Sequence, residues 1–109
     1  MSRRKEKINA LIKEFVSKFI LRDARIKNGL ITVIRTDMSS DFKNLKIYIT
    51  IYPEKWEEDG LKLLNKHKKR DWMKYLAENY KTKFLPKTEF LIDKGEKARI
   101  SVEELLKNN

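Results

Sequence analysis

Near the start of the chain, apolar residues recur at intervals of three and four positions. This spacing places them on one stripe of an amphipathic helix, with charged and polar residues on the opposite side. We therefore predict a helix over about residues 5–21 that packs its stripe into the core, with Phe15 in mid-stripe. The alternative is a helix that lies on a membrane surface. The stripe consists of Ile8, Leu11, Ile12, Phe15, Val16, Phe19 and Ile20.

Three segments have the composition that is typical of strands. The first covers about residues 30–36 and follows a turn signal at Asn28-Gly29. In the second, residues 45–52, isoleucine and leucine alternate strictly with other residues, which predicts a half-buried strand paired with the first as a hairpin. The third covers residues 87–93.

A helical region is expected between the second and third strands, from Trp56 or Leu61 to Lys83. Its apolar residues form two groups, separated by the segment NKHKKRD at residues 65–71, which contains none. A single straight helix would continue its apolar stripe through this segment. We therefore predict two helices, or one helix with a kink near residues 67–70.

The end of the chain predicts a turn at Lys94-Gly95 and then a short last helix. Ser101 would be the N-cap of that helix, and Glu104 would complete a capping box with it. The element order is then helix, strand, strand, helix, helix, strand and a short C-terminal helix. Strands that alternate with helices in this way predict a two-layer α+β sandwich. A chain of 109 residues fits one domain, residues 1–109.

Charge narrows the class of partner. The 26 Lys and Arg residues exceed the 16 Asp and Glu residues, which leaves a net charge of +10. Such an excess favours a polyanionic partner, with nucleic acid first and an acidic membrane surface second. The sequence has no cysteine, which excludes disulfides, thiolate nucleophiles and cysteine metal sites and is compatible with the cytoplasm. Charged residues interrupt the N-terminal apolar pattern, so no signal peptide or membrane span is expected there.

Catalytic motifs are absent from the sequence. Three glycines are too few for a phosphate-binding loop or a dinucleotide fingerprint. The single histidine, His67, lies within a run of lysines and is interpreted as a solvated or RNA-facing residue. Asp37, Asp41 and Asp93 could meet at strand ends and hold magnesium, which keeps a metal-dependent nuclease as an alternative. Turn chemistry explains aspartates at such positions equally simply.

The basic residues cluster around the predicted helix junction. Residues 62–87 contain nine bases and two acids, and so hold seven of the ten net charges. Such a cluster predicts phosphate contacts, although a solvated helix face is the alternative. The first candidate contacts are Lys66, Lys68, Lys69, Arg70 and Lys74, followed by Arg3, Arg4 and Lys5.

Three further residues have two interpretations each. Trp72 and Tyr75 could stack on bases, but their neighbours Met73 and Leu76 favour packing in the core. Arg25 could contact RNA, or it could only pair with Asp23 or a neighbouring carbonyl, and the structural role is preferred.

Three segments resemble the bacterial ribosome-binding factor A family. They are RDARIKNGLITV, SSDFKNLKIYITI and FLPKTEFLID, and a fourth, EKARISVEELL, resembles the family's C-terminal stretch, so that the resemblance extends over about residues 3–106. It differs at Ala24, where the family usually has proline, and at NKHKKRD, where the family has an alanine–x–glycine kink.

The resemblance implies a type II KH-like fold and binding to the 30S ribosomal subunit through 16S rRNA. It also implies a cytoplasmic role in late subunit maturation and in growth at low temperature, without catalysis, cofactor, small-molecule substrate or membrane. A monomer is expected off the ribosome. Two further alternatives are a general KH-like RNA- or DNA-binding module and a protein-interaction domain whose lysines only keep it in solution.

Overall fold

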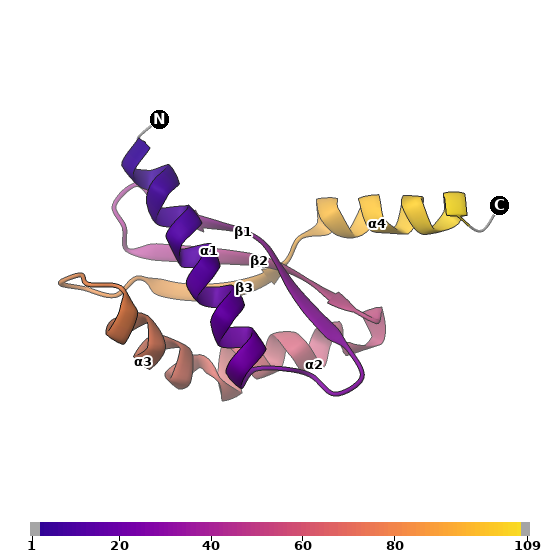
Figure 1. Cartoon of the computed structure of the whole chain (residues 1–109), viewed down its shortest axis with the longest axis horizontal. Helices are drawn as coiled ribbons and strands as arrows, with labels where there is room; N and C mark the ends of the chain where they lie inside the picture. The colour runs from indigo at the N-terminus through magenta and orange to yellow at the C-terminus, as the bar shows by residue number, and fades with distance from the viewer. Residues whose placement is uncertain (1–2, 108–109) are drawn as a thin grey trace.

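The fold is a three-stranded sheet with helices packed on one face. The computed structural model describes residues 3–107, apart from the side chains of residues 101–105 and 107 (Figure 1). The elements are α1 (Arg3–Asp23), β1 (Leu30–Met38), β2 (Asn44–Tyr52), a 3₁₀ turn η1 (Glu54–Trp56), α2 (Glu57–Lys62), a π-helical turn η2 (Leu63–His67), α3 (Lys69–Asn79), β3 (Lys87–Ile92) and α4 (Lys94–Lys107). The predicted α+β order is confirmed.

The strands lie in the order β1-β2-β3. β1 and β2 form the predicted antiparallel hairpin, in which Val33 lies opposite Ile49 and a bulge follows at Ile34. β3 pairs with β2 in parallel, with Ile47 opposite Phe90. The strict alternation in β2 is confirmed, since its leucine and three isoleucines are all buried.

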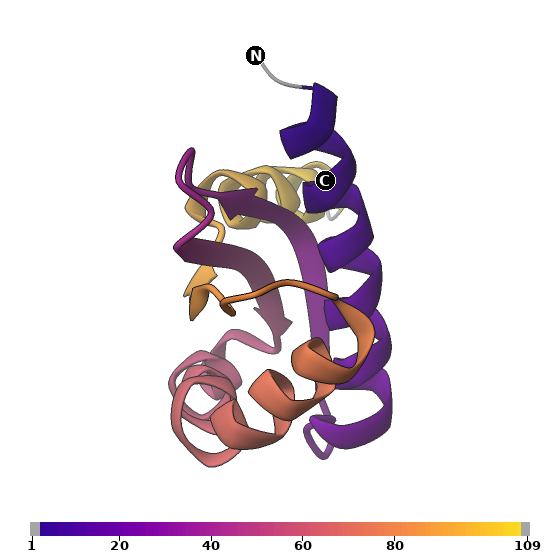
Figure 2. The same cartoon turned by 90° about the vertical axis from the view of Figure 1, so that its left-hand side faces the viewer.

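α1 and α3 lie next to each other on the same side of the sheet (Figure 2). Phe19 of α1 meets the ring of Trp72 of α3 edge-on, with ring centroids 5.5 Å apart. Four stripe residues of α1 are buried in this layer, namely Ile12, Val16, Phe19 and Ile20. The stripe is therefore core, as predicted, rather than a membrane-facing surface. Within the described residues, no helix is long and apolar enough to cross a membrane.

Phe15 lies less deeply than its place in the stripe predicts. It is half-buried and packs against the edge of the core, where its ring meets Tyr75 at 6.5 Å between centroids. Phe19, one helical turn later, occupies the central position instead. A helix of 3.6 residues per turn rotates successive stripe residues around its axis, so only part of a broad stripe faces the sheet directly.

The C-terminal helix begins earlier than predicted. Lys94 and Gly95 belong to α4 rather than to a turn, and Ser101 lies inside the helix rather than at its start. Asp93 caps the helix, because its Oδ1 accepts the backbone N–H of Glu96 at 3.0 Å. The side chains of Ser101 and Glu104 lie outside the described residues. α4 projects away from the sheet (Figure 1).

α2 approaches the sheet closely at a glycine. Gly60 is buried, and a Cβ at this position would come within 2.5 Å of Cδ1 of Ile51 in β2. The absence of a side chain therefore lets α2 pack directly on β2. At the other end of the helical region, α3 stops at Asn79, four residues before the predicted limit of Lys83.

Candidate nucleic-acid interface

The basic junction is a helix with one interrupted turn. α2 continues into η2, whose Leu63 carbonyl accepts the backbone N–H of Lys68 at 2.7 Å, five residues on. Lys68 itself leaves the helical region, with φ −107° and ψ 5°, and α3 begins at the next residue. The predicted kink near residues 67–70 is confirmed. Because φ is negative at Lys68, this kink needs no glycine, and lysine can stand there.

Two polar side chains fasten the junction to the outer edge of β3. The Asn65 amide donates to the Phe90 carbonyl and accepts the Phe90 N–H, both at 2.9 Å. The Lys69 ammonium donates to the Thr88 carbonyl, and Trp72 Nε1 donates to the Thr88 hydroxyl at 3.1 Å. The bonds of Asn65 and Lys69 satisfy backbone groups that the last strand of the sheet would otherwise leave unpaired.

Lys69 makes a structural contact and is less exposed than the sequence predicts, while its contact with phosphate stays a prediction. Its side chain is half-buried and directed at the sheet edge. Burial lowers the pKa of Lys69 below its usual value, and the nearby Glu89 opposes this shift. A lysine engaged in this way has fewer free N–H groups to offer to a phosphate.

The other junction bases divide into paired and unpaired groups. Lys68 lies 3.8 Å from Asp71, within a shallow groove between α1 and α3. Lys66, Arg70 and Lys74 are exposed, and none of them has an ion pair within residues 3–107. These three are the junction cations that are most available to phosphate groups.

The end of α1 adds a base that the sequence did not point to. Arg22 lines the same groove as Lys68 and Lys74, with its guanidinium 5.1 Å from the ring centre of Tyr75. It also pairs with Asp23 at 2.9 Å. Among the described residues Asp23 pairs with Arg22 and not with Arg25, which is exposed.

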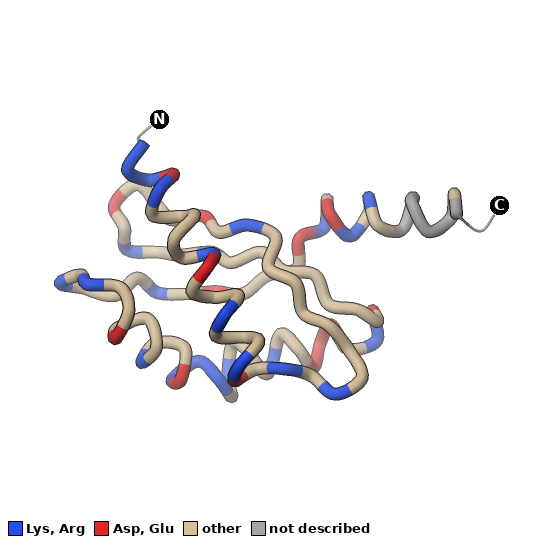
Figure 3. Tube along the Cα trace, in the orientation of Figure 1, with Lys and Arg blue, Asp and Glu red and all other residues tan. Residues whose placement is uncertain are grey.

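The N-terminal bases lie at the opposite end of α1 (Figure 3). Arg3 and Arg4 are exposed in the first turn, and Lys5 lies 3.8 Å from Asp37 of β1. At 1.5 Å per residue, Arg4 and Arg22 are separated by roughly 27 Å along the helix. The predicted contacts therefore form two separate basic surfaces rather than one.

The two aromatic candidates of α3 belong to the core. Trp72 is fully buried, so it has no face on which a base could stack. Tyr75 is half-buried and packs against Phe19 and Trp72, with Arg22 over its ring. The preference for packing is confirmed for both residues.

The alternative of a magnesium site has no support in the geometry. Asp37 pairs with Lys5, Asp41 bonds to Ser39, and Asp93 caps α4 while it pairs with Arg35 at 3.4 Å. Across the described residues there is no group of three potential metal ligands. His67 is exposed at the junction.

The chain is similar to one protein family over nearly its whole length. The family model described as Ribosome-binding factor A matches residues 4–106. The chain belongs to this family. A ribosome-binding factor A from Prochlorococcus marinus is 30% identical over 96% of this chain and 83% of its own length. One from Chlamydia pneumoniae is also 30% identical, over 96% of this chain and 90% of its own.

Solved structures of ribosome-binding factor A share the fold. The crystal structure from Thermus thermophilus is 30% identical and superposes with a TM-score of 0.69, covering 81% of this chain and 94% of that one. A homology model of the Thermus thermophilus ribosome-binding factor A, fitted into an electron microscopy map of a 30S complex, is 29% identical, with a TM-score of 0.62 over 76% and 88% of the two chains. The predicted KH-like fold is confirmed.

Proposed function

We propose that this protein binds the 30S ribosomal subunit through 16S rRNA during late maturation, and leaves when that region has folded. The observation that carries the proposal is the family match over residues 4–106. The Thermus thermophilus relative that was fitted into a 30S complex supports the choice of partner. With this partner, the protein would act in the cytoplasm, as a monomer off the ribosome.

The junction cations supply the proposed phosphate contacts. Lys66, Arg70 and Lys74 are exposed and unpaired in the described part of the chain, and Lys68 and Arg22 flank them. Each base that neutralises a phosphate releases condensed counterions, which makes the binding tight at low salt and weak at high salt. Arg3, Arg4 and Lys5 form a second contact region at the other end of α1.

The attachment of the junction to β3 suits this role. Asn65 and Lys69 hold the kink against the sheet, so the neighbouring cations project from a fixed backbone. A preorganised surface loses less conformational freedom on binding. In this proposal the protein acts by occupying immature rRNA, with no catalytic step and no cofactor.

Sedimentation of the tagged protein from cell lysate tests the proposal. We expect the protein in the 30S fractions and not with 70S ribosomes, and we expect its depletion to raise the amount of unprocessed 16S rRNA. A protein that sediments only with free RNA or DNA would instead indicate a general KH-like nucleic-acid-binding module. Sedimentation free of nucleic acid at low salt would indicate a protein-interaction domain.

A further inference from the structure

A second candidate surface lies at the end of the molecule away from the helix junction. The first turn of α1, the turn between β1 and β2, and the loop between α3 and β3 come together there (Figures 1 and 3). The Lys87 N–H donates to the Lys43 carbonyl at 2.9 Å, which joins the last two segments. Between them is an open groove of about 540 Å³, here called the Phe84 groove, lined mainly by Asp41, Phe42, Lys43, Lys83, Phe84 and Lys87.

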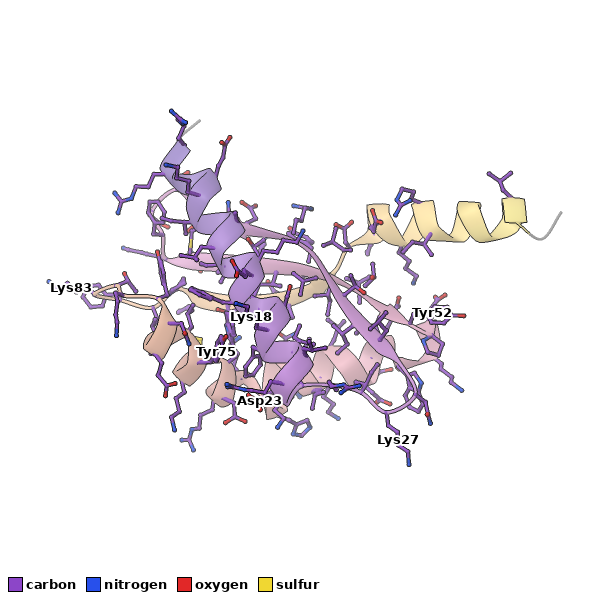
Figure 4. The ribbon with its side chains drawn as sticks, in the orientation of Figure 1. Lys18, Asp23, Lys27, Tyr52, Tyr75 and Lys83 are labelled. Atoms are coloured by element: carbon purple, nitrogen blue, oxygen red, sulfur yellow. The ribbon has the colours of Figure 1, made fainter. Side chains whose placement is uncertain are left out.

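The loop between α3 and β3 presents a phenylalanine to solvent. Tyr80 and Leu85 pack against the core on either side of the loop, and Pro86 is buried. Phe84, next to these anchors, is 74% exposed. Lys83 projects at the tip of the loop (Figure 4), with its ammonium 5.5 Å from the ring centre of Phe84. An exposed phenylalanine contributes little to folding, so its ring is free to bind a partner.

The loop between α3 and β3 forms one wall of the groove. The turn between β1 and β2 forms the opposite wall, which is also aromatic and basic. Phe42 has a φ of 59°, a left-handed conformation that is rare for a bulky residue. Its N–H donates to the Ser39 carbonyl at 2.9 Å, which holds this conformation in place. The guanidinium of Arg4 lies 5.4 Å from the ring centre of Phe42. The turn therefore fixes an aromatic ring and a cation beside the groove.

The charge of the groove favours an anion. Lys43, Lys83 and Lys87 line it, against the single carboxylate of Asp41. That carboxylate accepts hydrogen bonds from the Ser39 hydroxyl at 2.6 Å and from the Lys43 N–H at 3.1 Å. Since Asp41 is engaged within its own turn, the three lysines dominate the charge along the groove.

We propose that the Phe84 groove binds an unpaired nucleotide of single-stranded RNA, with its base stacked on Phe84 and its flanking phosphates near Lys43, Lys83 and Lys87. Aromatic rings between cations are the usual means of binding single strands, because every base has a face that can stack. A base inside a duplex has both faces covered by its stacked neighbours and cannot reach the ring. The inference rests on the proposed RNA-binding function and adds a base-stacking contact to the phosphate contacts proposed there.

The test is a binding measurement in a variant that lacks the junction cations. In the background Lys66→Ala, Arg70→Ala and Lys74→Ala, we would titrate a fluorescein-labelled single-stranded oligoadenylate RNA. Adding Phe84→Ala should raise Kd about 5- to 150-fold, the loss expected for one stacked base, with an unchanged salt dependence. Phe84→Tyr should restore the affinity, since it keeps an aromatic ring. Tyr52→Ala, which removes a 65% exposed aromatic at the other end of the sheet, should change nothing.

Three results would overturn the inference. Equal affinity with and without Phe84 would show that the ring does not stack on a base. A lower salt slope in the Phe84 variant would mean that the loss is electrostatic. Weaker binding to 30S particles with unchanged binding to the oligonucleotide would assign the ring to a ribosomal protein. The proposed function is judged separately, because it fails only if the wild-type protein does not bind 30S particles.

Discussion

Asn65 and Phe90 exchange two hydrogen bonds, both 2.9 Å long, between a side-chain amide and the main chain of a strand. Asn65 stands in the π-helical turn, and Phe90 is a buried residue of the last strand of the sheet. The amide thus occupies the place that the next strand of the sheet would take. Through this pair, the segment that carries the junction cations is bound to the sheet itself.

We predict that Asn65→Ala lowers the free energy of unfolding by about 1–3 kcal/mol. The substitution leaves the N–H and carbonyl of Phe90 without partners in a partly buried position. Asn79→Ala is the matched control, because the Asn79 amide bonds to the Tyr75 carbonyl on an exposed surface. Urea denaturation measures both variants. Equal stability losses would show that the Asn65 bonds are no stronger than a surface contact.

Two phenylalanines of α1 should differ in their contribution to stability. Phe19→Ala is expected to cost about 3–5 kcal/mol, because the side chain is fully buried between α3 and the sheet. Phe15→Ala should cost clearly less, since that ring is half-buried. Thermal melts of the two variants rank them. A larger loss for Phe15 would mean that α1 is rotated relative to the sheet.

Adjacent bases at the junction should behave differently when each is changed to alanine. Lys69→Ala removes the donor to the Thr88 carbonyl, and we expect a loss of about 1 kcal/mol or more. Arg70→Ala changes an exposed residue and should stay within about 0.5 kcal/mol of the wild type. Chemical denaturation compares the two variants. Indistinguishable midpoints would show that the bond from Lys69 to the Thr88 carbonyl does not stabilise the fold.

The polar run at residues 65–71 shows what could be predicted about the junction and what could not. A gap in the apolar pattern correctly indicated that the helix is interrupted. It gave no sign that Asn65 and Lys69 bind the edge of β3, because hydropathy does not distinguish a side chain that bonds to backbone from one that faces water. The same ambiguity made Lys69 look fully exposed.

The sequence contains two capping signatures for the C-terminal helix, and the prediction used the second of them, whereas the helix begins at the first. Asp93 and Glu96 have the spacing of an N-cap and its third helical residue, as do Ser101 and Glu104. Gly95 made the first pair look like part of a turn, since glycine between two charged residues is typical of a turn.

The Phe84 groove could not be predicted from the sequence, for another reason. Its two walls, at Phe42 and Phe84, are brought together only by the parallel pairing of β2 with β3.

The pKa of Asp41 should report the hydrogen bonds within the turn between β1 and β2. The Ser39 hydroxyl and then the Lys43 N–H hold the pKa of Asp41 below its ordinary value of 3.8. Because the folded-state pKa is depressed, this stabilisation is present above pH 3.8 and is lost as the pH falls through the lower value. Carbon-detected NMR should give a midpoint below 3.8 that rises in Ser39→Ala. The same midpoint in both proteins would contradict this account of the turn.

The salt dependence of binding to purified 30S particles tests the central claim most directly. The variant Lys66→Ala, Arg70→Ala and Lys74→Ala spares the structural Lys69, and should fold with at most about 0.5 kcal/mol lost per site. Its control is the triple variant Lys13→Ala, Lys55→Ala and Lys94→Ala, which removes the same charge from exposed positions elsewhere.

We predict that the slope of log K against log salt concentration falls by about 2–3 in the junction variant, because each base contacts about one phosphate. The control should keep the slope of the wild type. Equal slopes in the two triple variants, or a wild-type slope in the junction variant, would contradict the claim that the helix junction binds rRNA.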